Sequence, residues 1–305
     1  MIIKIAEKLR PFTHQPGMKV PLPGSKWILQ VFPTLIKVFD GKEVVQDWPL
    51  DVQGPVKDFT VQLDLVKGCV HVFGQAQNGS FRKTVYPGES GISFAPTEAS
   101  KSVERLSLGS HKSQNWLGVT RRGDLKEILP VWFQLGQMIS RIDQDSSGGT
   151  FSLLKPDVES LTRLWLAGFE GLMTPRIEDT DLQGFNLPPV DPSLSPLPLL
   201  SDGWKVIRSL FFKEETLAIL PHVPKEFHCG RLIGLQTHNK LTINIEWSKK
   251  QLRRMEVMSQ EDSALKLLFP KELKSYRIEK EKRISTDNFL ELEKGKWYIL
   301  DNFRK

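Results

Sequence analysis

The chain has 305 residues, 39% of them hydrophobic and 26% charged, so it can bury a core and is not an intrinsically disordered chain. Its length is enough for about two domains of roughly 100–200 residues each. The net charge is +6, and residues 201–305 carry 21 lysines and arginines against 15 acids. Nucleic acid is a less favoured partner, because these basic runs are interleaved with acidic and apolar residues.

Targeting and metal-binding signals are missing from the printed sequence. No stretch approaches about 18 consecutive apolar residues, so we expect neither a membrane span nor a membrane partner. Residues 1–8 lack the continuous apolar core of roughly 7–15 residues that a secretory signal needs, which predicts a cytoplasmic protein unless a leader has been removed. Cys69 and Cys229 are far apart and no HxxxH or CxxC spacing occurs, so we expect no structural metal and no cofactor.

Residues 1–122 predict an N-terminal antiparallel β-sandwich. Trp27–Phe32 and Leu35–Phe39 are short runs rich in β-branched and aromatic residues, and Phe59–Leu65 alternates with a period of two. Asn78–Gly79 favours a tight hairpin turn that leads into Ser80–Tyr86. Short strands at this spacing are typical of an antiparallel sandwich.

Residues 123–173 predict a short helical segment. Asp124 can cap a helix that runs to about Ile142, although Pro130 within the pattern also allows a start nearer Leu129. A second helix is expected from Pro156 to about Leu172. The tryptophans at helical or strand spacing, Trp132, Trp165 and Trp247, are expected in the core.

Residues 174–203 contain many prolines and predict an extended linker, and residues 204–305 predict a C-terminal antiparallel β-domain. Leu241–Trp247 alternates cleanly between apolar and polar residues, and Arg231–Thr237 and Leu252–Met258 are expected beside it. Lys294–Lys296 is expected in a final hairpin. The chain as a whole is therefore expected to be mainly β with a short helical segment.

One stretch of this domain resembles a known family. Residues 215–235 read ETLAILPHVPKEFHCGRLIGL, and Thr242–Trp247 and Leu292–Leu300 follow at suitable distances. This order is similar to the C-terminal β-domain of family 95 glycoside hydrolases, the α-L-fucosidase and α-galactosidase group, whose pattern is close to LLPALPxxWxxGxVxGLxARGG. The basic, glycine-containing stretch of that pattern is replaced here by residues 237–240, which read THNK.

The resemblance implies a reduced member of that group. In the family, an N-terminal β-sandwich, a helical linker, an (α/α)6 barrel and the C-terminal β-domain follow one another. Twelve helices of about 11–12 residues each, with their loops, need far more than the 80 residues from Gly123 to Asp202. The domain that holds the family's catalytic carboxylates is therefore expected to be missing or collapsed, and no catalytic residue carries over.

Two groups of residues are candidates for a site. Glycoside hydrolysis needs two carboxyl groups, and the densest acidic group comprises Glu170, Glu178, Asp179 and Asp181. A solvated loop with helix-capping or arginine-pairing roles is the alternative for these four. The second group is polar and aromatic and could hold a sugar or an anion, with an anchored connecting segment as its alternative. It comprises His111, Lys112, Gln114, Asn115, Trp116, Arg121 and Arg122.

Three functional hypotheses follow from these observations. The first is a reduced glycoside-hydrolase-like protein that binds carbohydrate or has lost catalytic activity. The second is an active enzyme with a site between the helices and the β-domains, marked by two convergent carboxylates. The third is a basic scaffold that binds nucleic acid or a protein partner, marked by a steep dependence of binding on salt.

Overall fold

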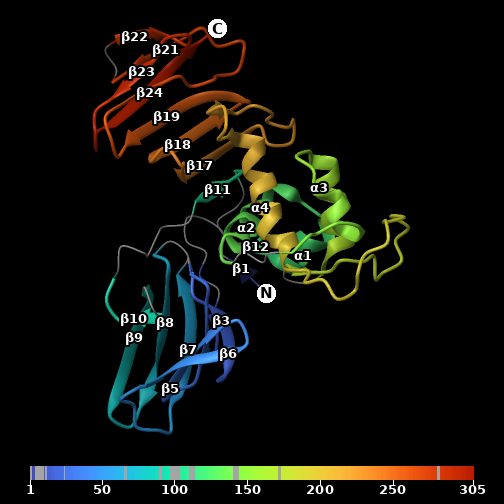
Figure 1. Cartoon of the computed structure of the whole chain (residues 1–305), viewed down its shortest axis with the longest axis vertical. Coiled ribbons are helices and arrows are strands. Elements are labelled where there is room, and N and C mark those ends of the chain that lie inside the picture. The colour runs from blue at the N-terminus through green and yellow to red at the C-terminus, as the bar shows by residue number, and fades with distance from the viewer. Residues whose placement is uncertain are drawn as a thin grey trace. The chain divides into compact units, whose positions relative to one another are not determined.

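The computed structural model describes residues 2–3, 10, 12–23, 25–64, 67–88, 91–96, 104–109, 114–139, 144–170, 173–279 and 282–305 (Figure 1). The chain forms two compact units. The N-terminal unit comprises Glu7–Val103 and Gln134–Asp143, and the C-terminal unit comprises Met1–Ala6, Glu104–Phe133 and Gln144–Lys305. Residues 1–122, predicted as one sandwich, therefore contribute to both units.

The fold is mainly β, with several antiparallel sheets and four α-helices in the described part of the chain, which confirms the predicted fold class. Two sheets form the N-terminal unit in the residues that the structure describes. The four-stranded sheet has the order β3 (Met18–Pro21), β4 (Trp27–Val31), β5 (Leu35–Asp40) and β6 (Glu43–Pro49). The five-stranded sheet has the order β10 (Gly91–Ser93), β9 (Gly79–Gly88), β8 (Cys69–Ala76), β7 (Lys57–Asp64) and β2 (Phe12–Thr13).

The core of the N-terminal unit follows from the period of two along these strands. In β4 the burial alternates, with Trp27, Leu29 and Val31 inward. Trp48 of β6 and Phe94, just after β10, meet edge to face with ring centroids 5.3 Å apart, and this contact joins the two sheets. Alternating side chains thus supply apolar faces that the two sheets bury against each other.

The helical elements are α1 (Trp116–Arg122), α2 (Leu125–Gly136), the 3₁₀ helix η1 (Gly149–Leu153), α3 (Val158–Gly168) and α4 (Pro198–Phe211). Asp124 precedes α2, and its Oδ1 accepts the Lys126 N–H at 3.1 Å, so the helix starts at Leu125 and continues through Pro130. The alternative start near Leu129 is wrong. Asp157 caps α3 by accepting the Ser160 N–H at 2.7 Å. No helix in the described ranges is both long and apolar enough to cross a bilayer.

Helix α4 was not expected from the sequence, because a proline-rich stretch leads into it and Gly203 lies in its middle. Pro198 suits the first turn, where its missing N–H has no helical acceptor to lose. Gly203 lies against the indole of Trp132 in α2, and an added Cβ would lie 2.6 Å from Nε1 and overlap the ring. The close approach of the two helices therefore requires glycine, at a cost in helix propensity.

Seven antiparallel strands form the main sheet of the C-terminal unit, in the order β11 (Arg105–Ser107), β17 (Cys229–Gln236), β18 (Leu241–Ser248), β19 (Gln251–Ser259), β24 (Trp297–Arg304), β21 (Ser275–Ile278) and β22 (Lys282–Ser285) (Figure 1). Four two-stranded sheets complete the described part of the unit. They are β1 (Ile2–Ile3) with β12 (Gln114–Asn115), β13 (Phe169–Glu170) with β14 (Thr174–Pro175), β15 (Phe212–Lys213) with β16 (Ala218–Ile219), and β20 (Ser263–Leu265) with β23 (Leu290–Leu292).

The seven-stranded sheet has one buried and one solvated face. Along β18 the burial alternates at every residue, with Trp247 fully inside the core. Phe211, the last residue of α4, stacks on Trp247 with ring centroids 4.9 Å apart. The indole N–H of Trp247 donates to the Phe227 carbonyl at 2.9 Å, so this buried donor is satisfied. Trp132 and Trp165 are also buried, and the predicted core placement of all three tryptophans is confirmed.

Candidate functional site on the C-terminal sheet

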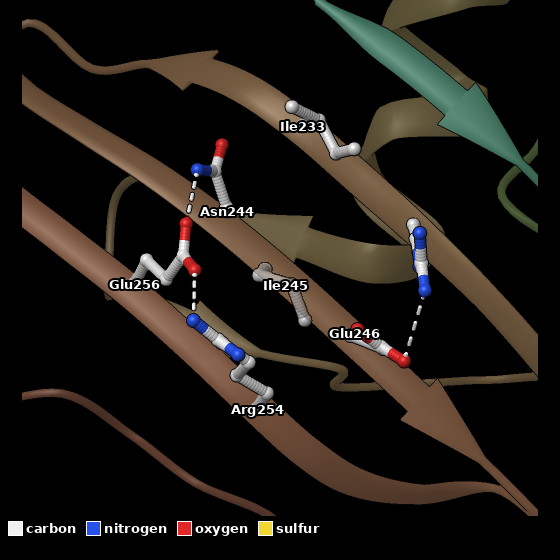
Figure 2. Close-up of a pocket in the computed structure, with 7 residues that line it drawn as sticks. Ile233, Asn244, Ile245, Glu246, Arg254 and Glu256 are labelled. Atoms are coloured by element: carbon white, nitrogen blue, oxygen red, sulfur yellow. Dashed lines mark hydrogen bonds and ion pairs between the residues drawn. The ribbon is translucent and has the colours of Figure 1, made fainter. Parts of the chain in front are cut away.

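The solvated face of the seven-stranded sheet carries a polar hollow of about 300 Å³, which we call the sheet hollow (Figure 2). Strands β17, β18 and β19 form its floor. Its side chains include Arg231, Ile233, Asn244, Glu246, Arg254 and Glu256. Because three adjacent strands hold these groups, their positions depend on the ladder and not on a loop.

A β-bulge borders the sheet hollow on the β17 side. Between the residues Leu232 and Leu235, which pair regularly with β18, Ile233 and Gly234 stand opposite the single residue Asn244. Gly234 has φ +73°, a conformation that glycine adopts without strain, and its N–H donates to Asn244 Oδ1 at 2.8 Å. The Asn244 side chain thereby satisfies a donor that the ladder leaves unpaired.

A second bulge borders the hollow on the β19 side. Arg253 and Arg254 together stand opposite Glu246, where a flat ladder would place one residue. Both arginines are exposed, whereas their neighbours Leu252 and Met255 are buried. The extra residue therefore turns two consecutive guanidinium groups to the solvated side. Bulges often re-aim side chains beside functional sites, and here two of them flank one hollow.

Hydrogen bonds and ion pairs orient the polar groups of the hollow (Figure 2). Asn244 Nδ2 donates to Glu256 Oε2 at 2.8 Å, and Arg254 Nη2 lies 2.8 Å from the other oxygen of Glu256. Arg231 Nη2 donates to Glu246 Oε1 at 3.4 Å. Exposed ion pairs such as these contribute about 0–1 kcal/mol, so they set side-chain direction more than stability and can exchange for contacts with a ligand.

The sheet hollow is part of a longer row of charges. Directly opposite residues of antiparallel strands lie on the same face, and the ladder registers align one charged residue from each of six strands. In strand order the row is Arg231, Glu246, Arg254, Asp301, Arg277 and Arg283. Arg277 donates from Nε and Nη2 to the two oxygens of Asp301 at 2.8 and 3.0 Å. Cations thus alternate with carboxylates across most of the sheet.

A second and larger hollow of about 810 Å³ lies near β20, β22 and β23. Phe289 on its lining is 64% exposed, which is unusual for a large apolar side chain. Asn288, Glu291 and Tyr298 line it as well. We call it the Phe289 hollow. It serves as the control surface for binding to the sheet hollow.

The acidic group predicted as a weak catalytic candidate has structural contacts in the described residues. Asp181 Oδ2 accepts from Arg176 at 3.1 Å, and Asp179 Oδ2 accepts the Gly184 N–H at 3.0 Å. Glu178 is exposed, and Glu170 lies in β13 with its side chain outside the described part. The contact of Asp181 is the arginine pairing of the alternative interpretation, whereas Asp179 caps a loop and not a helix, and the catalytic assignment stays a prediction.

The predicted ligand-binding group is only partly described. His111 and Lys112 lie outside the described residues. Gln114 and Asn115 form β12 and Trp116 begins α1, but their side chains are not among those described. Arg121 and Arg122 lie in the last turn of α1, where Arg122 pairs with Glu127 at 3.4 Å. Their role in binding also stays a prediction.

The residues of the sheet hollow were not predicted as a site. Local signals for them exist: Gly234 interrupts a strand pattern, as a bulge does, and two consecutive arginines break the period of two between Leu252 and Met255. The ladder register that brings the two bulges to opposite sides of β18 has no local signal.

Comparison with known proteins agrees with the sequence resemblance. The family model for the C-terminal domain of glycoside hydrolase family 95 matches residues 213–300, a range that contains the sheet hollow. The curated proteins contain no match to the chain. The four α-helices of the described residues do not amount to a full helical barrel. The predicted resemblance is thus confirmed, and residues 213–300 are similar to the C-terminal β-domain of family 95 glycoside hydrolases.

Proposed function

We propose that this glycoside-hydrolase-related chain binds carbohydrate without hydrolysing it, and that the sheet hollow is the binding site. The main support is the hollow itself, where two bulges and three strands hold arginine, amide and carboxylate groups side by side. Sugar hydroxyls both donate and accept hydrogen bonds, so a surface that presents planar donors beside acceptors matches them. The similarity of residues 213–300 to a glycoside hydrolase domain is consistent with this ligand class.

The chemistry of the hollow supports binding more than hydrolysis. A general acid for glycoside cleavage is a carboxylic acid that an apolar pocket keeps protonated. Glu246 and Glu256 instead lie on an open face, where arginines and an amide donate to their oxygens. Carboxylates in this setting can accept hydrogen bonds from sugar hydroxyls, which is a recognition role.

Calorimetric titration and thermal shift against neutral and acidic mono- and oligosaccharides, including L-fucose and galactose, test this proposal. Ligand that binds only the folded state raises the melting temperature. We expect Asn244→Ala and Glu256→Gln to weaken binding by about tenfold or more, because each removes a group that orients the hollow. Phe289→Ala is the matched control in the second hollow and should leave affinity unchanged.

Three results would contradict the proposal. Absence of binding across the panel at millimolar sugar would remove the carbohydrate function. Loss of affinity with Phe289→Ala but not with Asn244→Ala would move the site to the Phe289 hollow. Release of free sugar from oligosaccharides or reporter glycosides would show that the protein hydrolyses its ligand.

A further inference from the structure

We infer that the carbohydrate of the sheet hollow is acidic, a glycan that carries carboxylate or sulfate groups, and that the β18–β19 turn takes part in binding it. This inference rests on the proposed function and specifies its ligand class. Three independent features of the same face support it. They are the cations without ion-pair partners among the described residues, the backbone of the turn, and the alternation of charge along the row.

The first feature is a set of three exposed cations that form no ion pair with any described residue. Lys249 and Lys250 form the turn between β18 and β19, and Arg253 is the bulged residue that follows. All three are exposed, and none has an ion-pair partner among the described residues. Arg253 adjoins Arg254, which lines the sheet hollow. Positive charge is therefore concentrated at one end of the hollow.

The second feature is the backbone of the turn. Ser248 pairs with Gln251, so the loop has two residues, and Lys249 and Lys250 have φ values of +52° and +59°. Two positive φ values define a type I′ turn, for which Asn-Gly is the favoured sequence. A lysine in this conformation is less stable than a glycine, because its Cβ crowds the following carbonyl oxygen. The turn thus carries two charged side chains where the backbone favours Asn-Gly, which is consistent with a role for those charges in binding.

The third feature favours an acidic glycan over a nucleic acid as the ligand. The row of six charged residues alternates arginines with the carboxylates Glu246 and Asp301 before it ends on Arg277 and Arg283. A phosphate on every nucleotide would place negative charge against those carboxylates. A glycan can instead set its acidic groups on the arginines and its hydroxyls on the carboxylates.

The experiment uses the full chain and matched polymer pairs. Affinity is measured by calorimetry for polygalacturonate and its carboxyl-reduced form, for a sulfated galactan and its desulfated form, and for single-stranded RNA and DNA. We expect an acidic glycan to bind at least about tenfold more tightly than its neutral counterpart, with an affinity that falls as salt rises. The first two pairs distinguish carboxylate from sulfate as the recognised group.

The variant Lys249→Asn/Lys250→Gly separates binding from stability. It removes two charges and supplies the favoured type I′ sequence, so the melting temperature should rise while affinity for the acidic glycan falls by about tenfold. Arg253→Gln should weaken the same binding. The control is Lys42→Asn/Lys155→Asn, which removes two charges from exposed lysines outside the sheet and should leave affinity within about twofold.

The outcomes distinguish this inference from the proposed function. Equal binding of the acidic and neutral polymers leaves the carbohydrate function intact and overturns the inference. Binding of no polymer overturns both. Tighter binding of RNA or DNA than of either acidic glycan at the same salt identifies a general polyanion surface and overturns the inference, as does unchanged affinity in the turn variant.

Discussion

Arg208 Nε donates to both carboxylate oxygens of Glu104, at 3.0 and 3.2 Å, although the two residues are 104 positions apart in the chain. The guanidinium of Arg208 also donates to Glu214 at 3.0 Å and to the Gln236 carbonyl at 2.7 Å. The side chains of Arg208 and Glu104 are only 12% and 9% exposed. One largely buried side chain of α4 thus links the start of β11 to the end of β17, at the edge of the sheet that carries the hollow.

Arg208→Met should strongly destabilise the C-terminal unit. The variant removes the guanidinium that pairs with the buried carboxylate of Glu104, and breaking a buried pair in this way costs about 3–5 kcal/mol. Urea denaturation followed by circular dichroism measures the loss. The double variant Glu104→Gln/Arg208→Met should recover part of it, because no buried charge is then left alone. As a control, Arg231→Met breaks an exposed pair and should lower the free energy of unfolding by less than about 1 kcal/mol. A similar loss for Arg208→Met and Arg231→Met would contradict the argument.

The stabilisation that Glu214 provides should depend on pH. Burial alone would raise the pKa of Glu214, but hydrogen bonds from His238 and Arg208 outweigh it and lower the pKa below the ordinary value of 4.5. An acid with a lowered pKa in the folded state stabilises the fold above its unfolded pKa, and that stabilisation is lost as pH falls through the folded pKa. Glu214→Gln should therefore reduce the free energy of unfolding at neutral pH and change it little at strongly acidic pH. A difference independent of pH would rule this out.

Gly203→Ala tests the approach of α4 to α2. Alanine favours helix over glycine by about 1 kcal/mol, yet its Cβ would overlap the Trp132 ring. Overpacking of this kind typically costs about 1–3 kcal/mol, so we expect net destabilisation in spite of the better helix propensity. Lys205→Ala, at an exposed position of the same helix, is the control and should change stability by less than about 0.5 kcal/mol. A more stable Gly203→Ala variant would show that the helices can separate freely.

The two cysteines should differ sharply in reactivity. Cys69 is fully buried, and burial, reinforced by the negative charge of Asp64, raises the pKa of its thiol to about 11. Cys229 is only partly buried. Since the thiolate is the nucleophile, iodoacetamide at neutral pH should modify Cys229 in the folded protein and Cys69 only after unfolding. Mass spectrometry of Cys69→Ser and Cys229→Ser variants measures the two rates separately, and rapid labelling of Cys69 in the folded chain would be the contrary result.

Local patterns in the sequence are enough to predict several elements and the faces that they bury. The alternation of Leu241–Trp247 predicts the strand β18 and the inward direction of Trp247, because a strand sends successive side chains to opposite faces. The helix expected from Pro156 is observed as α3, which begins at Val158 after the cap at Asp157. The resemblance of residues 215–235 to a family 95 domain is carried by the same kind of local information, a short ordered set of leucines, prolines and glycines.

The candidate site depends on information that no local pattern contains. Alternation assigns Asn244 and Glu246 to the solvated face, but only the tertiary structure decides that Gly234 and Arg254 lie opposite them. The neighbours of a strand are chosen by burial of the whole sheet face, through pairs that are distant in sequence. For the same reason α4 was missed: its glycine disfavours a helix locally, and only the packing of Gly203 against Trp132 explains it. Sequence by itself determined which residues could face solvent, and the ladder register decided which of them meet to form the hollow.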